Sequence, residues 1–433
     1  MKKQSIWYEH VSLPEFPKLE KNLSTDIVVI GGGLAGILTS YYLTKEGFHV
    51  ILLEKDRIGR GKTGNSTGVI SLEHDVLYQD LVKEEGFSVA KSYLKENLSA
   101  IKAYQELARQ YDFDLEERPL YLYATEKDEI IKKEVKVLND LGISAKEVDK
   151  IELPFPVKKA AYIPGQFQMN PLKLIAALAP KLEIYEHSMV TRWKGHQVFV
   201  GPYRVSAKKI IVATHFPFIN RVGLYFAKMY QKRSFVVALN THQNLKGSYL
   251  NIEEKNFYFR DYKGYLIIGG NDRKTGTCGP TFQNLIDYGK KHEPNAKLEY
   301  LWANQDCVTL NQIPYIGIYS RLFPDVFVIT GMNLWGMTQS MIAAHLMKDI
   351  LLGKKKSKES IYSPHRGMIS LQLFKNLGNF IRHLFTFHSK RCSHMGCALR
   401  WNETEKSWDC PCHGSRFSIE KEVIDNPAMR KIK

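Results

Sequence analysis

The stretch Asp26-Ile-Val-Val-Ile-Gly31-Gly-Gly33-Leu-Ala-Gly36 joins an apolar strand directly to a Gly-x-Gly-x-x-Gly turn. Apolar residues then recur at helical spacing over residues 37–43, as expected for a helix that packs on this strand. In such a unit Gly31 permits the tight turn, Gly33 lets the backbone approach a pyrophosphate, and Gly36 lets the helix pack closely. The helix N-terminus stabilises the phosphate charge. The stretch therefore predicts the strand, turn and helix of a dinucleotide-binding fold.

A second apolar strand, residues 49–53, follows the helix and ends at Glu54. Glu54 lies about twenty residues beyond the glycines, where a carboxylate can accept a hydrogen bond from a ribose hydroxyl. A glycine turn alone is weak evidence, but here strand, turn, helix, strand and acid occur in register. The front of the chain is therefore predicted to be a Rossmann-like fold of the α/β class.

Near the other end of the chain lie two Cys/His pairs, in Cys392-Ser-His394-Met-Gly-Cys397 and Cys410-Pro-Cys412-His413-Gly-Ser415. Their spacings are Cys-x-His and Cys-x-x-His, whereas zinc sites more often use Cys-x2-Cys and His-x3-5-His. The spacing resembles a Rieske site, in which two Cys hold one iron of a [2Fe–2S] cluster and two His hold the other. The predicted cluster ligands are Cys392, His394, Cys410 and His413.

The length and composition are those of a globular enzyme with more than one domain. A chain of 433 residues exceeds the usual limit for one hydrophobic core, and its apolar and charged fractions are ordinary. The formal net charge of +16 would suit acidic partners, but Lys and Arg are scattered apart from one run at 354–358. No nucleic-acid-binding module is recognised, so nucleic-acid binding is not expected.

No targeting or membrane-spanning segment is expected. No apolar run reaches the ~18 residues of a transmembrane helix, and acidic residues precede the apolar run at 27–30, unlike the basic start of a signal peptide. The C-terminal motif contains four of the six cysteines, and Cys278 and Cys307 stand alone. This distribution favours a metal site over a secreted disulfide framework, and the predicted compartment is the cytoplasm.

The loop after the second strand indicates which dinucleotide binds. Residues 55–67, Lys-Asp-Arg-Ile-Gly-Arg-Gly-Lys-Thr-Gly-Asn-Ser-Thr, resemble the second FAD-contacting loop of the D-amino-acid dehydrogenase/glycine oxidase superfamily. Segments 209–215, 265–270 and 328–338 are similar to later blocks of this family, in the family's order. The resemblance covers residues 1–353 and implies FAD. The further FAD-contacting residues that it implies are Lys55, Gly61, Thr63, Asn65, Gly331, Gly336, Met337 and Thr338.

Residues 408–417, Trp-Asp-Cys-Pro-Cys-His-Gly-Ser-Arg-Phe, closely match the second cluster loop of family members with a fused Rieske domain. By this resemblance Cys397 and Cys412 form a disulfide that joins the cluster loops, although disulfides are unusual in the cytoplasm. Ser415 is expected to donate a hydrogen bond toward a cluster sulfide, and Phe417 replaces the Tyr of respiratory Rieske proteins. The expected potential is therefore in the middle of the Rieske range of about −150 to +300 mV.

The predicted architecture has three parts. They are a Rossmann-like FAD-binding domain with an inserted antiparallel substrate sheet (1–353), a basic linker with an amphipathic helix (354–390), and a small, shortened Rieske module (391–433). Helices are expected at 91–110, 126–140 and 340–352, and Asn170 is expected to cap a helix that begins at Pro171. Strands of the substrate sheet are expected at 234–239, 256–259 and 265–268.

Residues 373–385 have the apolar spacing of an amphipathic basic helix. This helix could cover the cluster loops against the flavin domain or lie on a membrane surface. The short stripe and thin basic face favour the first placement. Because few residues separate the linker from Cys392, part of the usual antiparallel Rieske scaffold is expected to be missing.

A two-electron flavin beside a one-electron cluster suggests a path for electrons. A small organic substrate would give a hydride to FAD, and single electrons would pass to the cluster and an unknown one-electron acceptor. No second Gly-x-Gly-x-x-Gly follows a strand between residues 80 and 330, which argues against NAD(P)H as the electron source. By family resemblance the substrate is an amine or amino acid.

Two residues are candidate catalytic groups. Arg260 lies in the predicted substrate sheet, where it could hold a substrate carboxylate, and His74 resembles a His-containing element of the family. An exposed or structural role stays open for both. Asn311 stands where relatives often have Asp. The spacing of Cys307 does not match the covalent flavin link of sarcosine oxidases, which favours a buried structural thiol.

The preferred function is an FAD-dependent dehydrogenase that passes electrons to a Rieske cluster, and two others stay open. A non-catalytic flavin and iron–sulfur carrier or redox sensor, with a degenerate Rieske site, would not turn over substrate. A Rieske oxygenase needs a mononuclear iron held by two His and a carboxylate. No convincing group of that spacing is found, so the oxygenase ranks last.

Overall fold

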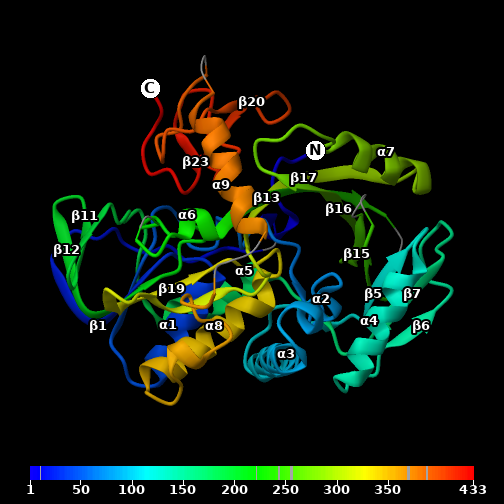
Figure 1. The fold of residues 1–433 in the computed structure, drawn as a ribbon, viewed down its shortest axis with the longest axis horizontal. Helices are drawn as coiled ribbons and strands as arrows, with labels where there is room; N and C mark the ends of the chain where they lie inside the picture. Colours follow the sequence, from blue (N-terminus) through cyan, green and yellow to red (C-terminus); the bar gives the residue numbers. More distant parts are fainter. Residues whose placement is uncertain (10, 221, 242–243, 254–256, 368–370, 387–388) are drawn as a thin grey trace.

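The structure, a computed structural model, consists of three parts that pack together (Figure 1). They are a parallel sheet with helices, a second and mainly antiparallel sheet, and a small C-terminal module. Figure 1 shows the module, coloured orange to red, above the region where the two sheets meet. The structure describes residues 1–433 except 10, 221, 242–243, 254–256, 368–370 and 387–388.

The parallel sheet forms the Rossmann-like part of the chain. Its strands are β1 (Leu23–Ile30), β2 (Val50–Leu53), β9 (Glu183–Tyr185), β10 (Arg192–Lys194), β11 (Gln197–Val200), β12 (Tyr203–Val212), β18 (Tyr315–Ser320) and β19 (Phe323–Thr330). Strands β9, β2, β1, β12 and β19 are parallel neighbours, and the others add antiparallel pairs. Val28 and Val29 belong to the cores on opposite faces of the sheet. The central strands are continuously apolar because both faces are buried.

Helices α1 (Leu34–Lys45) and α8 (Gly336–Leu351) pack against each other in one of these cores. Helix α1 begins directly after Gly33, as the glycine turn predicts. A Cβ atom at Gly36 would lie 1.9 Å from the carbonyl oxygen of Gly31, so only glycine allows this approach of helix to turn. The predicted strand, turn and helix are confirmed.

The second sheet is inserted into the Rossmann-like part and has the order β17-β13-β16-β15-β14-β5-β7-β6. Its strands are β5 (Leu120–Ala124), β6 (Lys146–Val148), β7 (Lys159–Ile163), β13 (Met229–Asn240), β14 (Ser248–Asn251), β15 (Tyr258–Tyr262), β16 (Tyr265–Lys274) and β17 (Lys297–Thr309). All pairs are antiparallel except β14 with β5.

The predicted inserted sheet is confirmed, but it is larger than expected. The strands expected at 234–239 and 265–268 lie within β13 and β16. The strand expected at 256–259 begins at Tyr258, and residue 256 lies outside the described residues. Sequence patterns missed β14, β17 and β5–β7. Their places depend on partners far away along the chain, which local spacing does not reveal.

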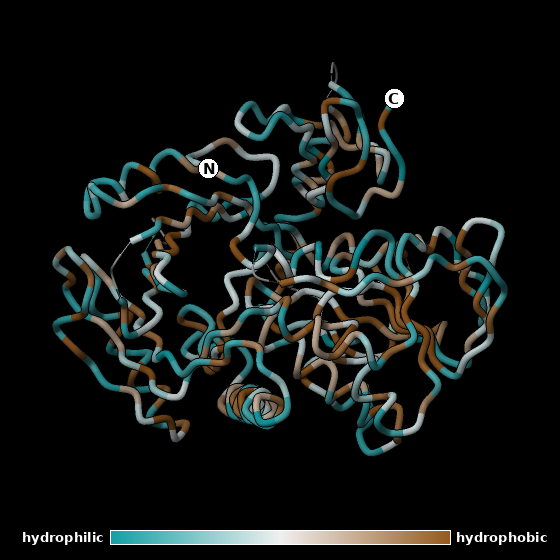
Figure 2. Tube along the Cα trace, turned by 180° about the vertical axis from the view of Figure 1, so that it is seen from behind, coloured by the Kyte–Doolittle hydropathy of each residue, from teal (hydrophilic) through white to brown (hydrophobic). Residues whose placement is uncertain are grey.

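The remaining helices cover the sheets. They are α2 (Leu77–Glu84), α3 (Phe87–Ala108), α4 (Asp128–Asp140), α5 (Pro171–Leu178), α6 (Tyr225–Lys228) and α7 (Gln283–His292), with short turns η1 (Ile6–Glu9), η2 (Ala179–Lys181) and η3 (Ser357–Glu359). A small sheet contains β3 (Val69–Ile70), β4 (Glu116–Glu117) and β8 (Phe167–Gln168). Helices α3, α4 and α8 confirm the three predicted helices. Brown, apolar segments concentrate in the strands, and teal ones in the outer loops (Figure 2).

The predicted helix cap at Asn170 is confirmed. Its Oδ1 accepts hydrogen bonds from the backbone N–H groups of Leu172 (3.0 Å) and Lys173 (3.3 Å), and Pro171 occupies the first turn of α5. These bonds satisfy N–H groups that have no partner within the helix.

The C-terminal module consists of helix α9 and a four-stranded antiparallel sheet. Its elements are α9 (Leu371–Leu384), β20 (Arg400–Asn402), β21 (Ser407–Asp409), β22 (Arg416–Phe417) and β23 (Val423–Asp425). The first Cys/His loop precedes β20, and the second joins β21 to β22. Helix α9 matches the predicted amphipathic helix. Over the described ranges, no helix combines the length and apolarity needed to cross a bilayer.

The Gly36→Ala variant tests the close approach of α1 to the glycine turn. The added Cβ overlaps the Gly31 carbonyl, so the free energy of unfolding is expected to fall by about 1–3 kcal/mol in urea titrations. The matched control is Gly378→Ala in α9, where an added Cβ meets nothing within 4 Å. Alanine favours a helix, so this control should be neutral or stabilising. Equal losses in both variants would contradict the packing argument.

Candidate functional site

A cavity of about 820 Å³ lies where the three parts of the fold meet. One wall comes from the glycine turn and the loop 54–69, another from the substrate sheet, and a third from residues 422–426 around β23. This volume is within the usual range of ligand cavities, about 300–1,000 Å³. The cavity lies at the carboxyl ends of β1 and β2, where open α/β sheets bind their ligands.

The glycine turn forms a backbone cradle at one end of this cavity. Gly31 has φ +114°, and an added Cβ would lie 2.5 Å from the Ala213 carbonyl oxygen. Gly33 lines the cavity at the start of α1, whose N–H groups point a partial positive charge at this end. The Thr63 hydroxyl accepts a hydrogen bond from the Leu34 N–H at 2.9 Å and so ties the second loop to the helix start. This cradle fits a pyrophosphate.

Glu54 lies at the end of β2 and lines the same cavity. Its Oε2 accepts a hydrogen bond from the Gly32 N–H at 2.6 Å, and its Oε1 accepts one from the Asp56 N–H at 3.0 Å. Burial raises the pKa of this carboxyl group, while the two N–H donors lower it. The backbone therefore holds the carboxylate in place beside the glycine turn, as expected for a ribose-binding acid.

The structure brings most of the predicted cofactor residues to the cavity and places three behind it. Those that line the cavity are Gly31, Gly33, Glu54, Lys55, Gly61, Thr63, Asn65, Gly336 and Met337. Gly36 packs on the turn, and an added Cβ at Gly331 would lie 2.2 Å from Cγ2 of Thr309. The Thr338 hydroxyl donates to the Ser71 carbonyl and accepts from the Ser71 N–H. These three residues support the wall without lining it.

Sequence reasoning missed two groups of lining residues. The first group, residues 188–190, follows β9. Its position at the carboxyl end of a parallel strand is the feature that could have predicted it. Asp75, Asp272 and Asp306 come from three distant segments, and no local pattern joins them.

Arg260 and His74 differ in their relation to the cavity. Arg260 is 1% exposed and lines the cavity, and Nε, Nη1 and Nη2 have no hydrogen-bond partner among the described residues. His74 is buried behind the wall and stacks on Trp335. Its Nδ1 lies 2.7 Å from the Tyr93 hydroxyl and its Nε2 3.0 Å from the Ser71 carbonyl oxygen. Burial lowers the pKa of His74 to about 3, so the ring is neutral. The geometry favours substrate contact for Arg260 and a structural place for His74.

The two cysteine-containing loops meet in the C-terminal module. The Sγ atoms of Cys397, Cys410 and Cys412 lie within 4.8 Å of one another. A hydrogen bond between the thiols of Cys392 and Cys410 has the largest effect on the pKa of Cys392, which it raises, and burial raises it further. The two sulfurs therefore lie side by side. All six cysteines are free thiols in the structure, and the bond between Cys397 and Cys412 stays a prediction.

The histidines of the two loops also come together, with the His394 and His413 ring centroids 5.0 Å apart. Nδ1 of His413 is buried and has no hydrogen-bond partner among the described atoms. Burial lowers the pKa of His413 to about 3, so its imidazole is neutral, as a metal ligand must be. Adjacent thiols and two imidazoles, one of them buried and neutral, are the donor set that a Rieske cluster needs.

Ser415 lies beside the sulfur ligands. Its hydroxyl oxygen accepts a hydrogen bond from the Ala428 N–H at 3.0 Å, which leaves the hydroxyl proton available for a sulfur. A hydrogen bond from this hydroxyl lowers the pKa of Cys392, against the larger raising effects of Cys410 and burial. Phe417 is buried in the core of the module and offers no hydroxyl.

Two glutamine amides hold the second cluster loop on the substrate sheet. Nε2 of Gln231, on β13, donates to the carbonyl oxygens of His413 (2.7 Å) and Asn426 (2.9 Å). Nε2 of Gln305, on β17, donates to the Gly414 carbonyl oxygen at 2.8 Å and to Oε1 of Gln231 at 2.7 Å. Both glutamines are buried. We call this pair the glutamine clamp.

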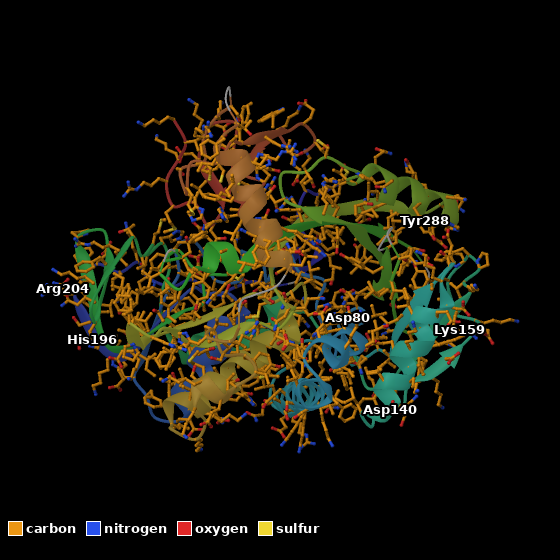
Figure 3. All side chains as sticks on the ribbon, in the orientation of Figure 1. Asp80, Asp140, Lys159, His196, Arg204 and Tyr288 are labelled. Carbon is orange, nitrogen blue, oxygen red and sulfur yellow. The ribbon has the colours of Figure 1, made fainter. Side chains whose placement is uncertain are left out.

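Charged side chains also cross the boundary between the module and the substrate sheet. Figure 3 shows the side chains that fill this region. Arg233 of β13 makes a two-pronged ion pair with Glu405, and Nε donates to Oε2 at 2.6 Å. Lys62 of the dinucleotide-binding part pairs with Asp425 of β23. Arg416 contacts both acids, which are about one-tenth exposed. Arg233 and Arg416 lower the pKa of Glu405 against the raising effect of burial. The module is therefore docked by buried, paired charges.

Comparisons with known proteins agree with this geometry. The family model described as FAD dependent oxidoreductase (DAO) matches residues 26–350, and the model of the Rieske [2Fe-2S] domain matches residues 373–433. The first match covers more than half of the chain. The two matches show that the first part binds FAD and the C-terminal part binds a [2Fe–2S] cluster.

Individual relatives cover the whole chain or one part of it. YhfW of Bacillus subtilis (strain 168), whose name describes a Rieske 2Fe-2S iron-sulfur protein, is 29% identical over 493 residues, with 99% of this chain and 97% of YhfW covered. Cytochrome b6-f complex iron-sulfur subunit 2 of Trichormus variabilis is 43% identical over 42 residues, which are 10% of this chain and 24% of that protein.

A solved structure shows the same fold for the first part. The crystal structure of glycine oxidase from Geobacillus kaustophilus has a TM-score of 0.69 and 20% sequence identity. The match covers 80% of this chain and 100% of that chain. The chain is therefore an enzyme that belongs to the FAD dependent oxidoreductase family and carries a C-terminal Rieske [2Fe–2S] domain.

Proposed function

We propose that the enzyme oxidises a small amine or amino acid and passes the electrons one at a time from FAD to its Rieske cluster. The observation that carries this proposal is the shared cavity, which the glycine turn, the substrate sheet and β23 line together. The fold likeness to glycine oxidase supports the substrate class. An acceptor beyond the cluster and a cytoplasmic location stay predictions.

The residues of the chain bind and orient the reacting groups. We assign FAD binding to the cradle of Gly31 and Gly33, to Glu54, and to the loop residues that line the cavity. When bound, FAD accepts a hydride and the [2Fe–2S] cluster accepts a single electron. The unpartnered guanidinium of Arg260 would hold a substrate carboxylate through paired N–H donors. Such a contact would place the substrate on the side of the cavity formed by the substrate sheet.

We assign cluster binding to Cys392, His394, Cys410 and His413. Both imidazole ligands contact residues of the flavin domain. His394 Nε2 lies 2.8 Å from Oδ1 of Asn220, and the His413 ring packs near Phe226 of α6, with centroids 6.0 Å apart. These contacts support electron transfer within the chain, because both histidines that would hold the cluster touch the flavin domain.

An anaerobic titration tests the proposed function directly. The oxidised holoenzyme is mixed with a panel of amines and amino acids while flavin absorbance and the Rieske EPR signal are recorded. At least one compound is expected to bleach the flavin and then produce the signal of the reduced cluster. Flavin that no compound bleaches would favour the alternative function, a non-catalytic carrier or sensor.

The Cys410→Ser variant separates the two cofactors. It is expected to lose the Rieske EPR signal and to retain flavin absorbance and bleaching by substrate, because Cys410 lies in the module and outside the FAD cradle. The Cys278→Ser control removes an exposed thiol outside the motif and should keep both signals. Loss of the EPR signal in the control, or its survival in Cys410→Ser, would contradict the ligand assignment.

The Glu405→Gln variant tests the docked position of the module. Removing one partner of a buried charge pair costs about 3–5 kcal/mol, because Arg233 and Arg416 are left undercompensated. Stopped-flow mixing should show an unchanged rate of flavin bleaching and a slower appearance of reduced cluster. Glu403→Gln is the matched control, since Glu403 is exposed on the same loop and pairs with Lys406. Similar cluster reduction rates in both variants would rule out a role for docking.

A further inference from the structure

Three carboxylates line the cavity that also contains the predicted FAD site. Asp272 of β16, Asp306 of β17 and Asp75, which precedes α2, all line the cavity. We call these three residues the acidic wall. Asn304 lies on the same face of β17 as Asp306, because side chains two residues apart share a face of a strand. Its amide nitrogen lies 3.4 Å from Oδ2 of Asp306.

A β-bulge turns Asp272 toward this wall. Arg233 pairs with Arg273, but Phe235 pairs with Gly270, so β16 contains one extra residue opposite Ser234. Asn271 within the bulge has φ +60°, a conformation that is uncommon for residues other than glycine. If side chains alternated regularly along β16, Asp272 would lie on the same face as Gly270. That face packs against Phe235 and α7, away from the cavity. The extra residue instead aims its carboxylate into the cavity, as bulges near active sites often do.

Two acceptor atoms at the wall lack donors. Oδ1 of Asp272 and Oδ1 of Asn304 are buried and have no hydrogen-bond partner among the described residues. Asn304 is 8% exposed, so water does not easily take the place of a donor. A buried polar atom without a partner is costly, and a cavity wall that keeps two such acceptors is built for a ligand with N–H or O–H donors.

The charges of the wall identify the kind of donor. Burial, together with Asp75 and Asp306, raises the pKa of Asp272 to about 7, although Lys232 lowers it. Burial raises the pKa of Asp306 to about 6, and Lys62, which lowers it, is paired with Asp425. Against the raising effect of burial, Lys232 lowers the pKa of Asp75 and of Asp272, and it forms no ion pair within the described part of the chain. The wall lacks positive charge, and an ammonium group would supply both the charge and the missing donors.

We propose that the acidic wall is the amine-binding subsite of the enzyme. A substrate ammonium group donates hydrogen bonds to Asp272 and Asn304, and Asp306 and Asp75 add the field that selects cations. This proposal rests on the proposed function, since it names the group by which that substrate is recognised. Arg260 lies one strand away on β15, opposite Ile267, five residues before Asp272 along β16. At about 3.3 Å per residue the backbone of Asp272 lies about 16 Å along β16 from Ile267, the residue paired with Arg260.

Three ligands of equal chain length test the subsite. Pentylamine, pentanoate and 5-aminopentanoate are titrated into oxidised holoenzyme, and binding is read from the flavin difference spectrum, with any bleaching recorded separately. The wild type should bind pentylamine and 5-aminopentanoate more tightly than pentanoate. In Asp272→Asn the Kd of both amines should rise about tenfold or more, which corresponds to about 1.4 kcal/mol. The Kd of pentanoate should stay the same or fall.

A second readout separates recognition from folding. Asp272→Asn removes an uncompensated buried charge, so its thermal unfolding temperature should stay the same or rise while amine binding weakens. Asp306→Asn should behave alike and provides a second variant, and Asp287→Asn, on the exposed face of α7, should leave all Kd values unchanged. Tighter binding of pentanoate than of pentylamine by the wild type, or amine Kd values within twofold in both wall variants, would overturn the proposal. Amine binding that weakens in the wall variants, together with a flavin that no amine or amino acid of the panel bleaches, would contradict the proposed function alone.

Discussion

The two-residue period of strands β13 and β17 determines how the two cofactor sites are related. Gln231 and Gln305 point to one face of the substrate sheet and bind the second cluster loop, while Ser234 and Asn304 point to the other face and line the cavity. One sheet therefore serves as the wall of the flavin site and as the support of the iron–sulfur module. A one-residue register shift in either strand would exchange these faces and disrupt both sites.

The boundary between module and flavin domain combines this clamp with buried charges. An ion pair such as Arg233 with Glu405 must repay the desolvation of both partners, so its net contribution to stability is small, but leaving one partner alone is costly. The network therefore favours a single docked position over nearby alternatives. Lys62 extends the network into the loop that contacts the dinucleotide site, so the contacts that position the module also hold a wall of the cavity.

Sequence patterns predicted those features that depend on neighbours along the chain. The glycine turn, the Asn170 cap and helix α9 each follow from residues within one or two turns of each other. The acidic wall could not be predicted, because its members come from three segments and Asp272 faces the cavity through a bulge that opposes regular alternation. His74 shows the opposite case. A family-like position suggested chemistry, but long-range packing on Trp335 and Tyr93 places its ring behind the wall.

The small size of the module also follows from its docking. A segment of about 40 residues rarely folds alone without a metal, a disulfide or a partner, because its core is too small. Here the sheet β20–β23 is short, and the flavin domain supplies the missing support. Added Cβ atoms at Gly276 and Gly414 would lie 2.8 Å from Pro411 and 2.7 Å from Gln231, and Asn379 of α9 donates to the Pro411 carbonyl at 2.8 Å. The substrate sheet and α9 thus contact the second cluster loop directly. The second cluster loop is held by the same strands that shape the substrate cavity, so the module can present its ligands in a fixed arrangement.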